Sequence, residues 1–269
     1  MTLHMNDRRK LAVVTGASSG IGLELALQFA NNGFDLILNA EDDALEEAGR
    51  RCRERGAEAT TVRQDLRTAA GVQALYAAIV AAGRPVAAAA VNAGVGRGGT
   101  FVEAPVADLL EVVELNVAST VHLTRLLLGD MVARDEGRLL LTSSIAATMP
   151  GAYAAVYNAS KSFVQSLAEA LQVELEVTGV TVTSLMPGPT ETNFFHRAQM
   201  DATSVGQGNK DDPADVARQG FEALMAGRSR VVPASLATKA QELLGKVLPD
   251  RVKAKRHEKM AEPQDTDRS

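Results

Sequence analysis

The sequence predicts an α/β fold built on a doubly wound parallel sheet with helices on both faces. Short apolar runs of strand type alternate with helical patterns from residue 10 to residue 233, which is the order that βαβ units require. A glycine-rich turn at 16–22 joins the first strand pattern to the first helical pattern. No break in composition occurs before about residue 235, so we expect a single domain over residues 1–269 with its core at about 10–235.

The first half of the chain holds four strand patterns separated by three helical ones. Two of the helical patterns end at glycines, Gly33 and Gly56, as helices commonly do. The run at 85–94 is rich in alanine, which is depleted in strands, but its place in the alternation predicts a strand. The predicted strands are 10–16, 34–40, 58–66 and 85–94, and the predicted helices are 20–33, 42–56 and 68–83.

The second half continues the alternation and then changes character. Strands are predicted at 137–144, 179–188 and 229–233, and helices at about 105–134, at 152–178 and at 212–227. The last of these helices starts with Asp212 and Pro213, a typical N-terminal signal. Residues 236–269 have helical character early and then become highly charged, so we expect a C-terminal helix followed by a charged tail.

Composition argues against several classes of protein. The formal net charge of −5 disfavours nucleic-acid and anionic-membrane partners. The N-terminus is polar and no run of about 18 apolar residues occurs, so we expect a cytoplasmic protein without a signal peptide or membrane span. The only cysteine, Cys52, is expected to be a half-exposed thiol without a redox role. The four histidines are scattered, so no metal site is predicted.

The turn TGASSGIG carries the first functional signal. Its glycines lack Cβ atoms and let a pyrophosphate approach the backbone, while the N-terminus of the next helix offers free N–H groups. The turn therefore predicts a dinucleotide site in a Rossmann-type fold, and a tight turn without a ligand is the alternative. The cofactor contacts expected here are Gly16, Ser18, Ser19, Gly20 and Ile21.

Acidic residues follow the second predicted strand. In a dinucleotide site an acid at this place binds the adenosine ribose, whereas a nearby arginine accepts the 2′-phosphate of NADP. The acids are Glu41, Asp42 and Asp43, and no Lys or Arg occurs between Asp35 and Arg50. The sequence therefore favours NAD, with Glu41 nearest the ribose, and disfavours NADP without excluding it. The alternative is that the acids only stabilise the next helix N-terminus.

Two further segments follow strands at the edge where doubly wound sheets bind ligands. Asp65, with Leu66 beside it, ends the third predicted strand and is placed to accept a hydrogen bond from the adenine amino group. Asn92, Ala93 and Gly94 end the fourth strand and are placed to pass under the adenosine.

One tyrosine is paired with a lysine at helical spacing. Tyr157 and Lys161 are four residues apart and share a helix face. A phenol has a pKa of about 10, and a nearby ammonium lowers it, which suits proton exchange with an alcohol or a carbonyl. Tyr153 has no lysine or histidine at this spacing and is expected to pack or to line a pocket. A surface cation–aromatic pair is the alternative, but Ser143 and Ser144 end the preceding strand and favour a site.

Taken in order, these motifs resemble the short-chain dehydrogenase/reductase family in its compact single-domain form. The resemblance covers about residues 10–235. The glycine turn at 15–22, the N-A-G at 92–94, the Y-x3-K at 157–161 and the P-G at 187–188 match family motifs. Ser144 matches the family serine thirteen residues before the tyrosine, and Asn116 matches the family asparagine of the fourth long helix.

The resemblance implies an NAD(P)-dependent oxidoreductase that moves hydride between a nicotinamide and a secondary alcohol or carbonyl compound. It implies that Tyr157 is the acid/base, that Lys161 lowers its pKa and holds the nicotinamide ribose, and that Ser144 binds the substrate oxygen. Asn116 is implied to break its helix locally and to order a water that links Lys161 to solvent. The implied contacts near the nicotinamide are Tyr157, Lys161, Pro187, Gly188 and Thr192.

Two positions depart from the family pattern for cofactor choice. Members that use NAD often have Asp where Ala40 stands, and members that use NADP often have Arg where Glu41 stands. Neither signature is complete, although the acid at position 41 keeps the preference for NAD.

The segment at 193–210 is implied to cap the substrate. Phe194, Phe195 and Met200 are expected to form an apolar wall, with ordinary packing as the alternative. Gly206 and Gly208 motivate the hypothesis of a mobile lid.

Two classes of function remain. One is an enzyme acting on a small-molecule alcohol or carbonyl, and the other is a catalytically vestigial dinucleotide-binding sensor or scaffold. The complete set of Asn116, Ser144, Tyr157 and Lys161 favours the enzyme, because a sensor need not keep it. The predicted helix at 152–178 is apolar beyond a single stripe, so we expect a homodimer or homotetramer built on this helix and on 105–134.

Overall fold

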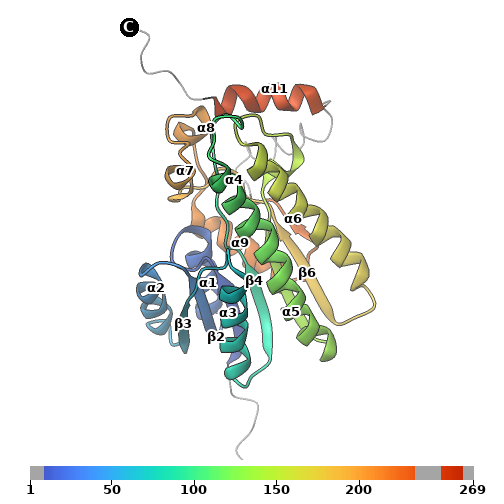
Figure 1. Cartoon of the computed structure of the whole chain (residues 1–269). Helices are drawn as coiled ribbons and strands as arrows, with labels where there is room; N and C mark the ends of the chain where they lie inside the picture. Colours follow the sequence, from blue (N-terminus) through green and yellow to red (C-terminus); the bar gives the residue numbers. More distant parts are fainter. Residues whose placement is uncertain (1–8, 234–249, 263–269) are drawn as a thin grey trace, which may run out of the picture.

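The computed structural model describes residues 9–233 and 250–262. Its centre is one sheet of seven parallel strands in the order β3-β2-β1-β4-β5-β6-β7, with helices on both faces (Figure 1). This is the predicted doubly wound fold. The chain moves outward from β1 to β3 and then returns to the other side of β1 at β4, so a crevice opens at the carboxyl ends of these strands.

All seven predicted strands are present, most of them a few residues shorter than expected. Pairing of β1 with β2 runs from Lys10 opposite Phe34 to Thr15 opposite Asn39. The strands are β1 Lys10–Thr15, β2 Phe34–Ala40, β3 Ala59–Arg63, β4 Val86–Val91, β5 Gly137–Thr142, β6 Val180–Leu185 and β7 Arg230–Val231.

The helices follow the predicted alternation with one interruption. The long helix expected at 105–134 is divided into α4 Val106–Val113, a π-helical segment η1 Glu114–Ala118, and α5 Ser119–Ala133, which agrees with the local break implied for Asn116. The other long helices are α1 Gly20–Asn31, α2 Ala44–Arg53, α3 Ala69–Ala81, α6 Ala155–Glu174 and α9 Pro213–Met225. Short turns of helix are η2 Ile145–Thr148, α7 Phe194–Arg197 and α8 Ser204–Gln207.

Within residues 236–269, where a helix followed by a charged tail is predicted, the structure has helix α11, Asp250–Ala261, which includes part of the charged stretch. The early helical character at 236–249 lies outside the described residues, as do 263–269. A charged helix of this kind forms when one face is buried, and Ala261 is only 1% exposed.

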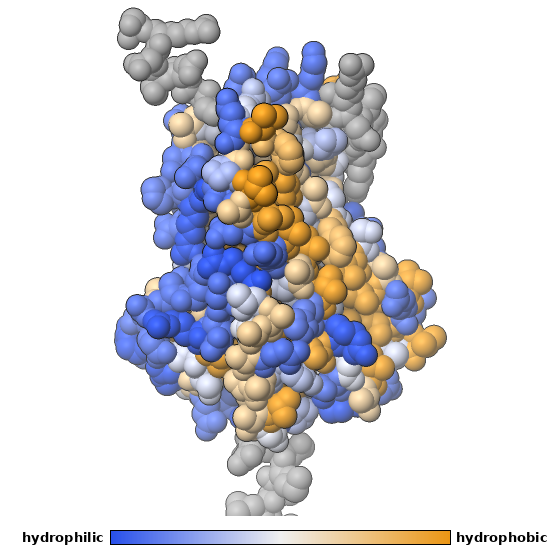
Figure 2. All heavy atoms as spheres, viewed as in Figure 1, coloured by the Kyte–Doolittle hydropathy of each residue, from blue (hydrophilic) through white to orange (hydrophobic). Residues whose placement is uncertain are grey.

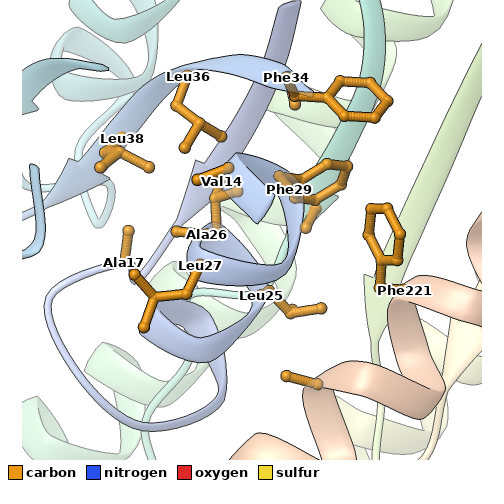
Figure 3. Packing of buried hydrophobic residues seen from close by; sticks show 14 of the residues in the cluster. Val14, Ala17, Leu25, Ala26, Leu27, Phe29, Phe34, Leu36, Leu38 and Phe221 are labelled. Atoms are coloured by element: carbon orange, nitrogen blue, oxygen red, sulfur yellow. The ribbon is translucent and has the colours of Figure 1, made fainter. Parts of the chain in front are cut away.

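Side chains alternate between the two faces of the sheet, and each face builds its own core. Leu140 of β5 belongs to the core that includes residues of α1, α2 and α9, whereas Leu139 and Leu141 belong to the core that includes residues of α3, α5 and α6. Figure 3 shows part of the first core, where Phe29 meets Phe34 and Phe221 edge to face, with ring centroids 5.2 and 5.1 Å apart. These contacts hold α1 and α9 against the sheet that carries the predicted cofactor site.

Two expectations about small residues have different outcomes. The alanine-rich run forms β4 in the middle of the sheet, where Ala88 and Ala90 face one core and Ala89 the other. Cys52 is a residue of α2, and its side chain is fully buried in the core. The expectation of a half-exposed thiol is therefore wrong. Burial raises the pKa of the Cys52 thiol to about 11, although neighbouring arginines act to lower it.

No helix in residues 9–233 and 250–262 is long and apolar enough to span a lipid bilayer.

Candidate active site

A pocket runs along the carboxyl edge of the sheet and collects the predicted site residues. Each predicted cofactor contact lines it, and so does Ser144. Asn116 is the exception, since it lies behind the pocket wall rather than on it. The lining residues predicted from sequence are Gly16, Ser18, Ser19, Gly20, Ile21, Glu41, Asp65, Leu66, Asn92, Ala93, Gly94, Ser144, Tyr157, Lys161, Pro187, Gly188 and Thr192.

The glycine turn has the geometry that a pyrophosphate requires. Gly16 and Gly20 have φ of +65° and +54°, in the left-handed region that favours glycine. A Cβ on Gly20 would lie 2.8 Å from Cγ2 of Thr192, so a side chain there would close the space between the turn and the β6 loop. The N-cap of α1, Ser19, makes no side-chain capping bond and no acid stands in the first turn. The helix N-terminus therefore fits an anionic group.

The acids after β2 are partly neutralised by arginines that come from elsewhere in the chain. Arg67 Nη2 donates to Glu41 at 2.5 Å, and Arg67 Nε donates to Asp65 at 2.9 Å. Arg197 of α7 lies 3.7 Å from Asp42. Burial acts to raise the pKa of Asp65, but the hydrogen bonds from Arg67 outweigh it and lower the pKa. Both arginines are distant from these acids in the sequence, so local spacing did not predict them.

The N-A-G segment is fixed by hydrogen bonds to the two flanking strands. Thr15 Oγ1 accepts from the backbone N–H groups of Asn92 and Ala93, both at 3.0 Å. Thr142 Oγ1 donates to Asn92 Oδ1 at 3.1 Å. These bonds hold the carboxyl ends of β1, β4 and β5 together as the floor of the pocket.

Tyr157 and Lys161 project from α6 toward the end of β5. The Ser144 side chain forms a hydrogen bond with Tyr157 and caps η2 by accepting from Ala146 N at 3.1 Å. Lys161 Nζ donates to the Thr142 carbonyl at 2.9 Å and lies 5.9 Å from the Tyr157 ring centroid. Ser143 instead donates to the Lys161 carbonyl at 3.0 Å, so Ser144 is the serine beside the phenol.

Burial shifts the pKa of both groups. Burial raises the pKa of Tyr157 to about 12, although the Ser144 hydrogen bond acts to lower it. Burial lowers the pKa of Lys161 to about 8. The net shift of the phenol pKa is therefore upward, because the effect of burial exceeds that of the neighbouring groups. Tyr157 carries its proton at neutral pH.

Asn116 supports this arrangement from behind. In η1, Asn116 Nδ2 donates to the Val95 carbonyl and to Ser160 Oγ, both at 2.9 Å, and Oδ1 accepts from Val95 N at 2.9 Å. Ser160 Oγ in turn donates to the Tyr157 carbonyl at 2.7 Å. The π-helical turn thus links the loop after β4 to the helix that carries the tyrosine.

The substrate end of the pocket has the expected apolar wall. Phe194 packs on Tyr157 with ring centroids 5.2 Å apart, and Phe195 and Met200 are buried beside it. Gly96 and Gly98 make room for this wall, because a Cβ on them would lie 2.5 Å from Phe194 Cζ and 2.6 Å from Met200 Cγ. The role of these two glycines was not predicted from the sequence.

Tyr153, two histidines and Met260 differ in how they lie relative to the pocket. Tyr153 lies in a turn before α6 with φ of +60° and packs on the cluster around Phe195. His196 is exposed and bonds Asp201. His257 and Met260 of α11 line the pocket, although nothing in the sequence indicated it. In the described ranges, no three His, Cys, Asp or Glu side chains gather as a metal site would need.

Comparison with known proteins gives the same family from sequence and from structure. Residues 10–203 match the family model for short chain dehydrogenase. Oxidoreductase UcpA of Salmonella typhimurium is 33% identical over 210 residues, which are 77% of each chain.

Two solved structures of this family are similar across the sheet. A short chain dehydrogenase/reductase from Burkholderia phymatum, in complex with NAD, is 30% identical with a TM-score of 0.80 and covers 88% of this chain and 92% of its own. A variant of actinorhodin polyketide ketoreductase with NADPH is also 30% identical, with a TM-score of 0.75, and covers 83% of this chain and 95% of its own. The chain is thus an NAD(P)-dependent oxidoreductase that belongs to the short-chain dehydrogenase/reductase family.

Proposed function

We propose that the protein transfers hydride between a nicotinamide dinucleotide and a secondary alcohol or carbonyl compound, with Tyr157 as the acid/base. The observation that carries the proposal is that Ser144, Tyr157 and the buried Lys161 line one pocket, which also holds the glycine turn. The similar actinorhodin enzyme is named a ketoreductase, which supports a carbonyl compound as one partner of the reaction.

Each residue of the set has a distinct task in this proposal. Ser144 Oγ donates to the substrate oxygen and holds it beside the phenol. Tyr157 gives its proton to that oxygen during carbonyl reduction and takes it back during alcohol oxidation. A bound nicotinamide dinucleotide supplies or accepts the hydride. Lys161 favours the phenolate by its charge, and Asn116 positions α6 through Ser160.

Replacing the phenol tests the acid/base role directly. Tyr157→Phe removes only the hydroxyl, so we expect turnover to fall by roughly 10²–10⁴-fold while NADH binding, followed by fluorescence, is kept. Tyr153→Phe is the matched control and should keep full activity, because Tyr153 packs outside the proton path. Undiminished turnover in Tyr157→Phe would refute the proposal. A wild-type protein that binds NADH but reduces no ketone and oxidises no alcohol of a broad panel would favour the sensor alternative.

For the cofactor, we propose a preference for NAD that is weaker than the sequence suggests. Glu41 lies at the end of β2, where a ribose-binding acid belongs, but it is held by Arg67. Arg67 also bonds Asp65 and Glu111, so its single positive charge is shared among three carboxylates. The neighbourhood stays acidic, and a 2′-phosphate would have to compete with Glu41 for the guanidinium.

We also propose that the protein forms a homodimer or homotetramer through α4, α5 and α6. Figure 2 shows hydrophobic residues gathered in a continuous band over this part of the molecule. Phe163 and Val173 of α6 are 42% and 67% exposed, and Val106 and Leu110 of α4 and Val121 of α5 are exposed beside them. Apolar patches of this extent usually mark an interface.

A further inference from the structure

Helix α11 closes the substrate end of the pocket. Figure 1 shows it lying across the top of the molecule, and it packs against α8. Ala261 is buried in a cluster with Phe195, Ala198 and Met200. His257 lies three residues before Met260 and four before Ala261, so it shares a helix face with each of them. His257 and Met260 line the same pocket as Tyr157.

One edge of the His257 ring is anchored to the loop before α6. Nδ1 lies 2.8 Å from the carbonyl oxygen of Ala152. A carbonyl oxygen only accepts hydrogen bonds, so Nδ1 must carry the hydrogen. Burial lowers the pKa of His257, although the bond to Ala152 acts to raise it. At neutral pH the ring is therefore neutral, and Nε2 carries a free lone pair.

The other edge of the ring carries Nε2. Among residues 9–233 and 250–262, the hydrogen bond described for this ring is that of Nδ1 with Ala152, which leaves Nε2 available as an acceptor. The nitrogens stand on different edges of the imidazole, so an Nδ1 fixed on Ala152 turns Nε2 away from that loop. The pocket around this end is lined by apolar side chains, including Met149, Phe194 and Met260. An acceptor nitrogen on a residue that lines this pocket suits a ligand that brings a hydrogen-bond donor.

We propose that Nε2 of His257 accepts a hydrogen bond from a second hydroxyl group of the substrate, separate from the reacting carbon. The substrate class is then a hydroxylated ketone, or the matching diol, with an apolar body that fits the Phe194–Met260 wall. The inference rests on the proposed function, in which Ser144 and Tyr157 bind the reacting oxygen. His257 acts as a specificity-determining residue and takes no part in proton transfer.

Matched ketones test the inference. Suitable probes are the ortho, meta and para isomers of hydroxybenzylacetone, each compared with its methyl ether, which keeps the size but lacks the donor. We expect wild-type enzyme to prefer at least one hydroxyl compound over its ether by about tenfold in kcat/KM, mainly through KM. His257→Phe keeps a ring but removes the acceptor, so the ratio of kcat/KM between each hydroxyl compound and its ether should fall to about one. His257→Gln can bond Ala152 and still present an oxygen, so it should restore part of the preference.

The outcomes separate this inference from the proposed function. Lys259→Ala, on the exposed side of α11, is the control for changes in the helix and should behave as wild type. Equal use of hydroxyl compounds and ethers, or a preference that survives His257→Phe, overturns the inference and leaves the reductase function in place. If no ketone is reduced, the His257 imidazole nitrogens are followed by NMR while hydroxyl ketones are added with NADH. An unchanged Nε2 signal then overturns the inference without reference to turnover.

Discussion

Replacing Lys161 by methionine is expected to stabilise the free protein while it removes turnover. The Lys161 side chain is almost wholly inside the protein, with 5% of its surface exposed. Burial lowers its pKa from an ordinary 10.5 to about 8. The folded state therefore holds this proton less tightly than the unfolded state does, and below pH 8 the protein carries the full cost of burying an ammonium.

The size of this cost follows from the difference between the two pKa values. A difference of about 2.5 pH units corresponds to about 3 kcal/mol of unfolding free energy. Methionine fills nearly the same space without the charge. It also loses the 2.9 Å bond from Nζ to the Thr142 carbonyl, which costs about 1 kcal/mol. The expected net gain is about 2 kcal/mol at pH 7, or about 4–8 °C in Tm for a protein of this size.

Urea unfolding of the wild type and of Lys161→Met over a range of pH measures this effect. Between about pH 8 and 10.5 the folded wild type loses the proton that the unfolded chain still holds, so wild-type stability rises with pH relative to the variant. The advantage of the variant should therefore be greatest at pH 7 and vanish above about pH 10.5. Lys259→Met on the surface should show no such pH dependence. A variant that is less stable than wild type at pH 7, or an advantage that does not change with pH, would refute the reasoning.

The remaining predictions concern the cofactor and the assembly. Glu41→Gln should remove one of the carboxylates that hold Arg67 and raise NADPH affinity about tenfold relative to NADH, whereas Arg67→Gln should strengthen the preference for NADH. Fluorescence titration measures the ratio of NADPH to NADH affinity in the wild type and in each variant. An equal ratio in these three proteins would contradict the proposed role of Arg67. Light scattering at micromolar concentration should show a dimer or tetramer. Phe163→Asp should lower the measured mass of the assembly. Val80→Asp makes a similar change at an exposed residue of α3 and should leave that mass unchanged. A monomeric wild type would exclude the proposed interface.

The fold was predictable because each element carries its own pattern in the sequence. The alanines of β4 show why the order of elements was more informative than propensity. Ala88, Ala89 and Ala90 make a poor strand by themselves, but they stand at the middle of the sheet, packed on both faces. Small side chains there let the helices approach the sheet closely. The strand ends were less predictable, since the strand predicted at 137–144 included Ser143 and Ser144, which lie between β5 and η2 in the structure.

The candidate site was predictable where its residues are neighbours in the chain. The glycine turn and the Tyr157–Lys161 pair are short segments whose spacing determines their shape. Arg67 and His257 were missed because they reach the site only through tertiary packing. Arg67 follows β3, one strand over from Glu41, and His257 comes from a helix 100 residues after Tyr157. A lone arginine or histidine in a charged stretch carries no local sign of such a role.

Tyr157 shows most clearly which properties the spacing of residues in the sequence does not predict. The separation of four residues on a helix correctly predicts that Lys161 lies near Tyr157. The Lys161 ammonium is 5.9 Å from the centroid of the Tyr157 ring. Spacing does not predict solvation, and here burial exceeds the effect of neighbouring groups and raises the phenol pKa to about 12. The same burial removes part of the affinity of Lys161 for its proton. A phenol that keeps its proton and a lysine that holds its own weakly both follow from enclosure in one pocket, so a change in the hydration of this pocket shifts the pKa of both groups together.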